Sequence, residues 1–123
     1  MLQLRSMLQV ADNSGAKLVQ LIGIPSKGNL SQATLGNVIT VVVKKADPKG
    51  QTKTHQIVRA IIVRSKKEYR RPDGSYIRFD ENACVVLDGK SKNPKGTRIF
   101  GPIGREIKAL GFTKIASLAK EIY

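Results

Sequence analysis

Length, composition and charge limit what this chain can be. Its 123 residues, 41% hydrophobic and 25% charged, are sufficient for one globular domain with a sizeable core. The 22 Lys and Arg residues exceed the 9 Asp and Glu residues, which gives a formal net charge of +13. Because such a charge opposes compaction, we expect a partner that neutralises it, and nucleic acid is favoured over an anionic membrane surface. No apolar run approaches the ~18 residues of a membrane span, and the start of the chain does not resemble a signal peptide.

The basic residues are unevenly placed along the chain. Residues 1–36 hold three of them, Arg5, Lys17 and Lys27, and the other 19 lie in residues 37–123. We therefore expect the N-terminal third to be mostly scaffold. The single cysteine, Cys84, excludes an intrachain disulfide and fits a reducing compartment.

The first third of the chain predicts three short strands, at residues 7–11, 17–24 and 37–45, because β-rich runs alternate there with turn residues. Asp12–Gly15 is interpreted as a tight turn, and a phosphate-facing loop of backbone N–H groups is the alternative. The polar stretch Ser26–Gly36 predicts a loop. Ala46–Gly50 predicts a turn, and residues 51–56 a polar connection.

The stretch Ile57–Leu87 is the centre of the predicted fold. Two β-rich runs, 57–63 and 77–87, flank a basic segment that reverses at Pro72-Asp73-Gly74. We call residues 64–78 the arm. It is expected to leave the core as a cationic two-stranded projection that could reach roughly 30 Å, at ~3.3 Å per residue. Such an arm contributes nothing to a hydrophobic core, whereas its cations could contact a polyanionic partner.

After Leu87 the pattern changes. Residues 88–97 predict a basic loop. Arg98–Pro102 predicts an extended segment, which Phe100 is expected to anchor on the packed strands. Two short helices follow, at 104–110 and 113–119, with Gly111 ending the first. Their inward residues are expected to be Ile103, Ile107, Leu110, Ile115 and Leu118, with Lys114 facing outward.

Together these elements predict an all-β fold. We expect a closed, mostly antiparallel barrel of five strands with a projecting hairpin arm and two short C-terminal helices. The whole chain, residues 1–123, is expected to be one domain. Residues 1–87 would form the barrel with its arm, and 88–123 a loop and a small helical region packed on it.

No pattern in the sequence predicts an enzyme, a metal site or a cofactor. His55 is the only histidine and lies in a polar loop, and Cys84 lies in an apolar run where a buried side chain is expected. Asp80 and Glu81 are adjacent, so in a strand they would point to opposite faces. Gly101 and Gly104 lack the spacing of a phosphate-binding loop.

Recognition of RNA phosphates is favoured over stacking on bases. The three Phe residues, at 79, 100 and 112, are expected in the core, which leaves Tyr69 and Tyr76 as the stacking candidates. We therefore expect the chain to bind folded, double-helical RNA through its phosphates and shape. Some of these cations could instead be solvated charges on a sheet face. The residues expected to bind RNA are Lys17, Lys44, Lys45, Arg64, Lys66, Lys67, Arg70, Arg71, Arg78, Arg98 and Arg105.

Separated motifs resemble the signature of one known family. Ala60-Ile61-Ile62-Val63 is followed at the family's spacing by Asp73-Gly74, Phe79, Asn82 and Val85-Val86. This pattern, with residues 10–16, 70–74 and 96–102, resembles the universal large-subunit ribosomal protein L-fourteen family over essentially the whole chain. The segment Ser26–Leu35 departs from that family because it holds a single basic residue.

The resemblance implies a five-stranded barrel with a β-ribbon and small C-terminal helices. It also implies a place on the large-subunit face that meets the small subunit, in the ribosomes of a bacterial cytoplasm, a mitochondrial matrix or a plastid stroma. The implied partners are large-subunit rRNA, small-subunit rRNA across a bridge, and neighbouring proteins of the L-nineteen and L-three families. A ribosomal silencing factor is a further implied partner. Thr97, Arg98 and Lys114 are the residues implied for the intersubunit and factor-docking surface.

Two other functions fit the charge of the chain. A free-standing RNA chaperone of the barrel type should expose a cluster of aromatic side chains, which the sequence does not predict. A membrane-surface protein should carry a longer amphipathic helix than residues 104–110 provide.

Overall fold

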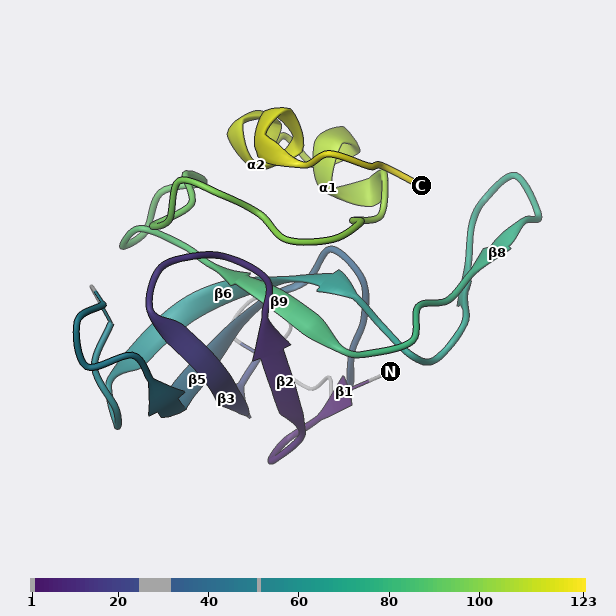
Figure 1. Cartoon of the computed structure of the whole chain (residues 1–123). Helices are drawn as coiled ribbons and strands as arrows, with labels where there is room; N and C mark the ends of the chain where they lie inside the picture. The colour runs from purple at the N-terminus through teal and green to yellow at the C-terminus, as the bar shows by residue number, and fades with distance from the viewer. Residues whose placement is uncertain (1, 25–31, 51) are drawn as a thin grey trace.

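The computed structural model describes residues 2–24, 32–50 and 52–123. Five strands close into a barrel, and every neighbouring pair is antiparallel except β2 and β9, which run parallel (Figure 1). This confirms the predicted barrel. In barrel order the strands are β2 (Met7–Val10), β3 (Ala16–Gly23), β5 (Val38–Ala46), β6 (Ile57–Arg64) and β9 (Ala83–Val86).

Two apolar clusters hold the fold together, one inside the barrel and one outside it. Along β5 the side chains alternate, so that Ile39, Val41 and Val43 are fully buried in the barrel interior. Strand β9 is buried on both faces, because the C-terminal region covers its outer side. The outer cluster joins β6 and β9 to Ile99, Ile103, Ile107, Phe112 and Ile115.

The C-terminal region forms two short helices, α1 (Glu106–Ala109) and α2 (Thr113–Leu118), which lie over one side of the barrel (Figure 1). Gly111 has φ +94° just after α1, as expected for a residue that ends a helix. Ile107 and Ile115 face inward as predicted, and Lys114 is exposed. The prediction for Leu110 was wrong, because this side chain is 50% exposed.

The anchor of the segment 98–102 is Ile99 and not Phe100. Ile99 is 3% exposed, whereas Phe100 is 54% exposed. Ile99 bridges to Asp12, and the Phe100 N–H donates to the Ala11 carbonyl. Successive side chains of an extended segment point to opposite sides, so only one of the two can face the barrel.

A two-stranded sheet of β1 (Leu2–Gln3) and β4 (Gln32–Ala33) lies beside the barrel, and its Leu2 and Ala33 belong to the inner cluster. Neither strand was predicted. The segment 26–36 was expected to be a loop throughout. Residues 26–31 of it lie outside the described residues, as do Pro25 and Gln51.

The arm extends from the side of the barrel, as predicted (Figure 1). Its strands β7 (Tyr69–Arg70) and β8 (Tyr76–Ile77) form a ladder of only two residue pairs. The reversal between them includes Gly74 at φ +88°, whose N–H donates to the Arg71 carbonyl. The chain therefore turns where the sequence predicted.

Candidate nucleic-acid interface

Most of the basic residues predicted to bind RNA are exposed. They come from the barrel, the arm and the C-terminal region, so the described surface carries cations on all three parts. The exposed members of the predicted set are Lys17, Lys44, Lys45, Lys66, Lys67, Arg70, Arg78, Arg98 and Arg105. Thr97 and Lys114, predicted for factor docking, are exposed as well.

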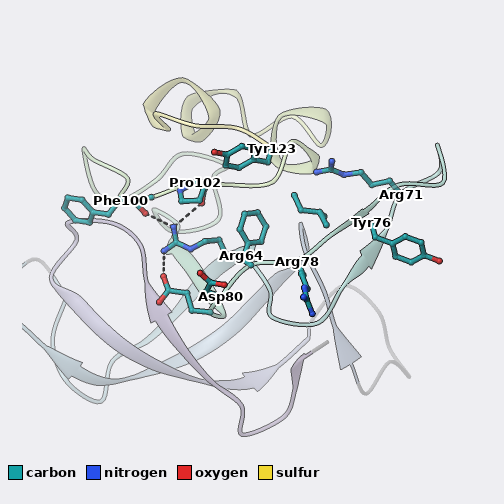
Figure 2. Close-up of a pocket in the computed structure, with 12 residues that line it drawn as sticks. Arg64, Arg71, Tyr76, Arg78, Asp80, Phe100, Pro102 and Tyr123 are labelled. Carbon is teal, nitrogen blue, oxygen red and sulfur yellow. Dashed lines mark hydrogen bonds and ion pairs between the residues drawn. The ribbon is translucent and has the colours of Figure 1, made fainter.

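Arg64 does not lie on this surface. Its residue is 6% exposed, and its guanidinium sits between the barrel and the segment 98–102 (Figure 2). Nη1 donates to the carbonyl oxygens of Phe100 and Pro102, at 2.8 and 3.1 Å, and Nη2 donates to Glu81 at 2.9 Å. The guanidinium is thus engaged by the protein itself, which differs from the phosphate contact expected for it.

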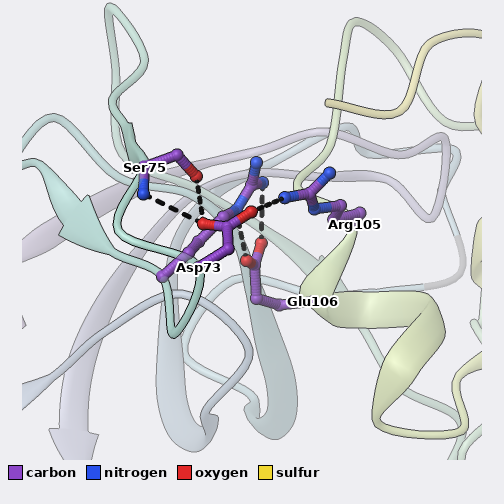
Figure 3. A network of polar contacts seen from close by, with 5 residues as sticks. Asp73, Ser75, Arg105 and Glu106 are labelled. Atoms are coloured by element: carbon purple, nitrogen blue, oxygen red, sulfur yellow. Dashed lines mark hydrogen bonds and ion pairs between the residues drawn. The ribbon is translucent and has the colours of Figure 1, made fainter.

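Arg71 is also directed inward. Its side chain, 8% exposed, forms a two-point ion pair with Glu106 of α1, with Nε to Oε2 at 2.6 Å and Nη2 to Oε1 at 3.1 Å (Figure 3). The hydrogen bond to Glu106 raises the pKa of Arg71. Burial acts to raise the pKa of Glu106. The hydrogen bond and the charge of Arg71 outweigh this effect, together with smaller contributions, so the pKa of Glu106 lies below its usual value. This pair connects the arm to the helix.

A second ion pair joins the same two parts of the chain. Arg105 Nη2 lies 3.0 Å from Asp73 Oδ2, with both side chains more than half exposed. Asp73 also accepts from the N–H and the hydroxyl of Ser75, which lowers the pKa of Asp73 and fixes the turn (Figure 3). The arm therefore projects from the barrel but is tied to the start of α1.

The turn Asp12–Gly15 has a structural role, which favours the first of its two interpretations. Asp12 Oδ1 accepts from the N–H and hydroxyl of Ser14, and Oδ2 accepts from the N–H of Val86. Asn13 Oδ1 accepts from the N–H groups of Thr97 and Arg98, at 2.7 and 3.0 Å. Asn13 thus holds the backbone of Thr97 and Arg98 from a position 84 residues earlier in the chain. No local signal in the sequence predicted this function of Asn13.

Aromatic side chains are more exposed than the sequence suggested. Tyr76, Phe100 and Tyr123 are 63%, 54% and 56% exposed, and all three line a cleft of about 850 Å³ together with Phe79 and Arg78. Figure 2 shows the rings of Phe100 and Tyr76 at opposite ends of the cleft. They do not form one platform for consecutive bases, so phosphate recognition stays the better model.

The described residues contain no group of three His, Cys, Asp or Glu side chains that could hold a metal ion. His55 is exposed, and Cys84 is fully buried, which raises the pKa of its thiol. Within the ranges that the structure describes, no helix is long and apolar enough to cross a membrane.

Known proteins match the chain over its full length. The family model described as ribosomal protein L14p/L23e covers residues 1–123. The large ribosomal subunit protein uL14 of Aquifex aeolicus (strain VF5) is 60% identical over 122 residues, 99% of each chain. The protein of the same name from Aquifex pyrophilus is 59% identical over 122 residues, also 99% of each. That from Petrotoga mobilis (strain DSM 10674 / SJ95) is 50% identical over 123 residues, 100% of each.

Proposed function

Since the chain belongs to the ribosomal protein L14p/L23e family, we propose that it is a structural constituent of the large ribosomal subunit. The observation that carries this proposal is the family match over residues 1–123, at 50–60% identity to proteins named for the large subunit. The net charge of +13 supports it, because rRNA phosphates would neutralise the self-repulsion of the folded chain. The role of a ribosomal protein also agrees with the predicted absence of an enzymatic activity.

We propose that the chain binds large-subunit rRNA through its exposed cations. An exposed guanidinium or ammonium group can approach a phosphate even where it also has an exposed acidic partner, as Lys67 and Arg105 do. The guanidinium groups of Arg64 and Arg71 are instead buried and paired with carboxylates. We therefore assign these two arginines to holding the protein in shape. The proposed rRNA contacts are Lys17, Lys44, Lys45, Lys66, Lys67, Arg70, Arg78, Arg98 and Arg105.

We further propose that Thr97, Arg98 and Lys114 form a docking surface for the bridge to small-subunit rRNA and for a ribosomal silencing factor. Support comes from the exposure of all three side chains and from Asn13, which fixes the backbone of residues 97 and 98. Neighbouring proteins of the L-nineteen and L-three families are proposed as the protein contacts on the large subunit.

Sucrose-gradient sedimentation of a cell extract tests these proposals. A tagged copy of the full chain should sediment with the large subunit and remain there after a high-salt wash, because many phosphate contacts must break together to release it. Recovery of the chain only at the top of the gradient would contradict the function.

The variant Lys114→Glu should enter large subunits normally but lower the fraction of joined ribosomes. Lost incorporation alone would contradict the docking assignment.

A further inference from the structure

Beyond its buried base at Arg64 and Ser65, the arm has little of its own to hold it in one orientation. Its ladder contains two residue pairs, and an isolated two-stranded hairpin is marginally stable in water. Residues 72–76 at its end are exposed, so no apolar core forms there. Something outside the arm must therefore fix its direction relative to the barrel.

The arm also does not pack closely against α1. An open cleft of about 910 Å³ lies between them, lined by Tyr69 and Pro72 of the arm and by Ala109 and Leu110 at the end of α1. The ion pairs Arg71–Glu106 and Arg105–Asp73 cross from the arm to α1 (Figure 3). Only the first is shielded from solvent, with side chains 8% and 15% exposed, so it is the pair that salt weakens least.

We propose that Glu106 is a positioning residue for RNA binding, which holds the arm in its binding orientation before RNA arrives. This inference rests on the proposed function. Glu106 itself touches no phosphate in this scheme. It fixes Arg71, and through it the neighbouring Arg70 and the rest of the arm's exposed cations, so that RNA binding does not have to order a loose hairpin.

If Glu106 positions the arm, replacing it should change the affinity for RNA in the direction opposite to that expected from net charge alone. Removing an acidic group from a chain of net charge +13 should strengthen binding to a polyanion. If Glu106 positions the arm, Glu106→Gln should instead weaken binding, because an NH₂ group replaces one of the two oxygens that accept from Arg71.

The experiment measures filter binding of an in-vitro transcript of large-subunit rRNA to the full chain over a salt titration. Glu106→Gln should weaken binding by roughly fivefold at each salt concentration, through the cost of ordering the arm. The slope of log K against log salt should stay unchanged, because no phosphate contact is lost. Glu68→Gln is the matched control, since it removes the same charge from an exposed arm residue that lies 3.5 Å from Lys67. This control should bind as well as the original chain or better.

Two further measurements separate positioning from general damage. Amide hydrogen exchange of Arg71 and Gly74, whose N–H groups close the arm turn, should become faster in Glu106→Gln, while amides of β5 and β6 should not change. Exchanging the partners, with Arg71→Glu and Glu106→Arg together, should recover affinity that each single change lowers. Equal or tighter binding by Glu106→Gln would overturn the inference. If the unaltered chain fails to bind the transcript, the proposed function fails instead.

Discussion

The structure assigns Arg64 to the interior, and replacing it tests that assignment. In Arg64→Met a flexible apolar side chain of similar length fills the space but offers no donor. The carbonyl oxygens of Phe100 and Pro102 and the carboxylate of Glu81 then lose their partner. An unsatisfied buried acceptor costs about 1–3 kcal/mol, and removing one member of a buried ion pair about 3–5 kcal/mol.

The cost of breaking a buried ion pair does not apply here in full, because the Glu81 side chain is 38% exposed and water can hydrate its carboxylate. We therefore expect a loss of about 3 kcal/mol in the free energy of unfolding. With an unfolding entropy of about 2.1 cal/mol/K per residue, such a loss lowers the Tm of a chain of this size by roughly 10 °C.

Calorimetry gives the Tm, and filter binding over a salt titration gives the number of phosphate contacts. Arg64→Met should lower the Tm without changing the salt slope, since Arg64 meets no phosphate. The exposed Arg70 is the matched control. Arg70→Met should leave the Tm nearly unchanged and reduce the salt slope by ~0.9, the change expected for the loss of one phosphate contact. A reduced slope with an unchanged Tm in Arg64→Met would refute the assignment.

Three further predictions concern buried or paired groups. Asp12→Asn should cost about 1–3 kcal/mol in urea unfolding, because the new NH₂ must face the N–H of either Ser14 or Val86 whichever way the amide turns. Cys84 should resist alkylation by iodoacetamide until the chain unfolds, since burial, followed by the Asp12 charge, raises the pKa of its thiol. Acid should weaken the pair of Glu106 with Arg71. The pKa of Glu106 is lowered in the folded state, so its contribution is complete above its ordinary value of 4.5 and is lost as the pH falls through the folded value. The stability difference between the original chain and Glu106→Gln should therefore shrink between urea titrations at pH 6 and pH 3.

The barrel could be predicted because its strands carry local signals. A run such as Val38–Ala46 is β-branched through its middle and bounded by turn residues, and its burial alternates as the pattern requires. The strand β4 could not be predicted in the same way, because two residues are too few to show a period. Phe100 was misplaced for a related reason: an extended segment puts alternate residues on opposite sides, and the sequence does not say which side faces the barrel.

The roles of Arg64 and Arg71 depend on contacts that are distant in sequence. Glu81 lies 17 residues after Arg64, and Glu106 lies 35 residues after Arg71. The arm holds six basic and two acidic residues, so its sequence predicts a cationic surface. Nothing in that local sequence shows that Glu81 and Glu106 will reach it. Composition therefore gave the right kind of partner for the chain, whereas only the fold separates the arginines available to that partner from those already engaged.

All four ion pairs in the described part of the chain involve the arm: Arg64–Glu81, Lys67–Glu68, Arg71–Glu106 and Arg105–Asp73. The chain has only 9 acidic residues, and the ion pairs place several of them beside the cations of the arm, where they can fix its orientation. The shielded pair Arg71–Glu106 should resist screening by salt, whereas contacts between exposed cations and phosphate weaken steeply as salt rises. The arm should therefore keep its orientation in salt that releases RNA, so that rebinding on dilution needs no reordering of the protein.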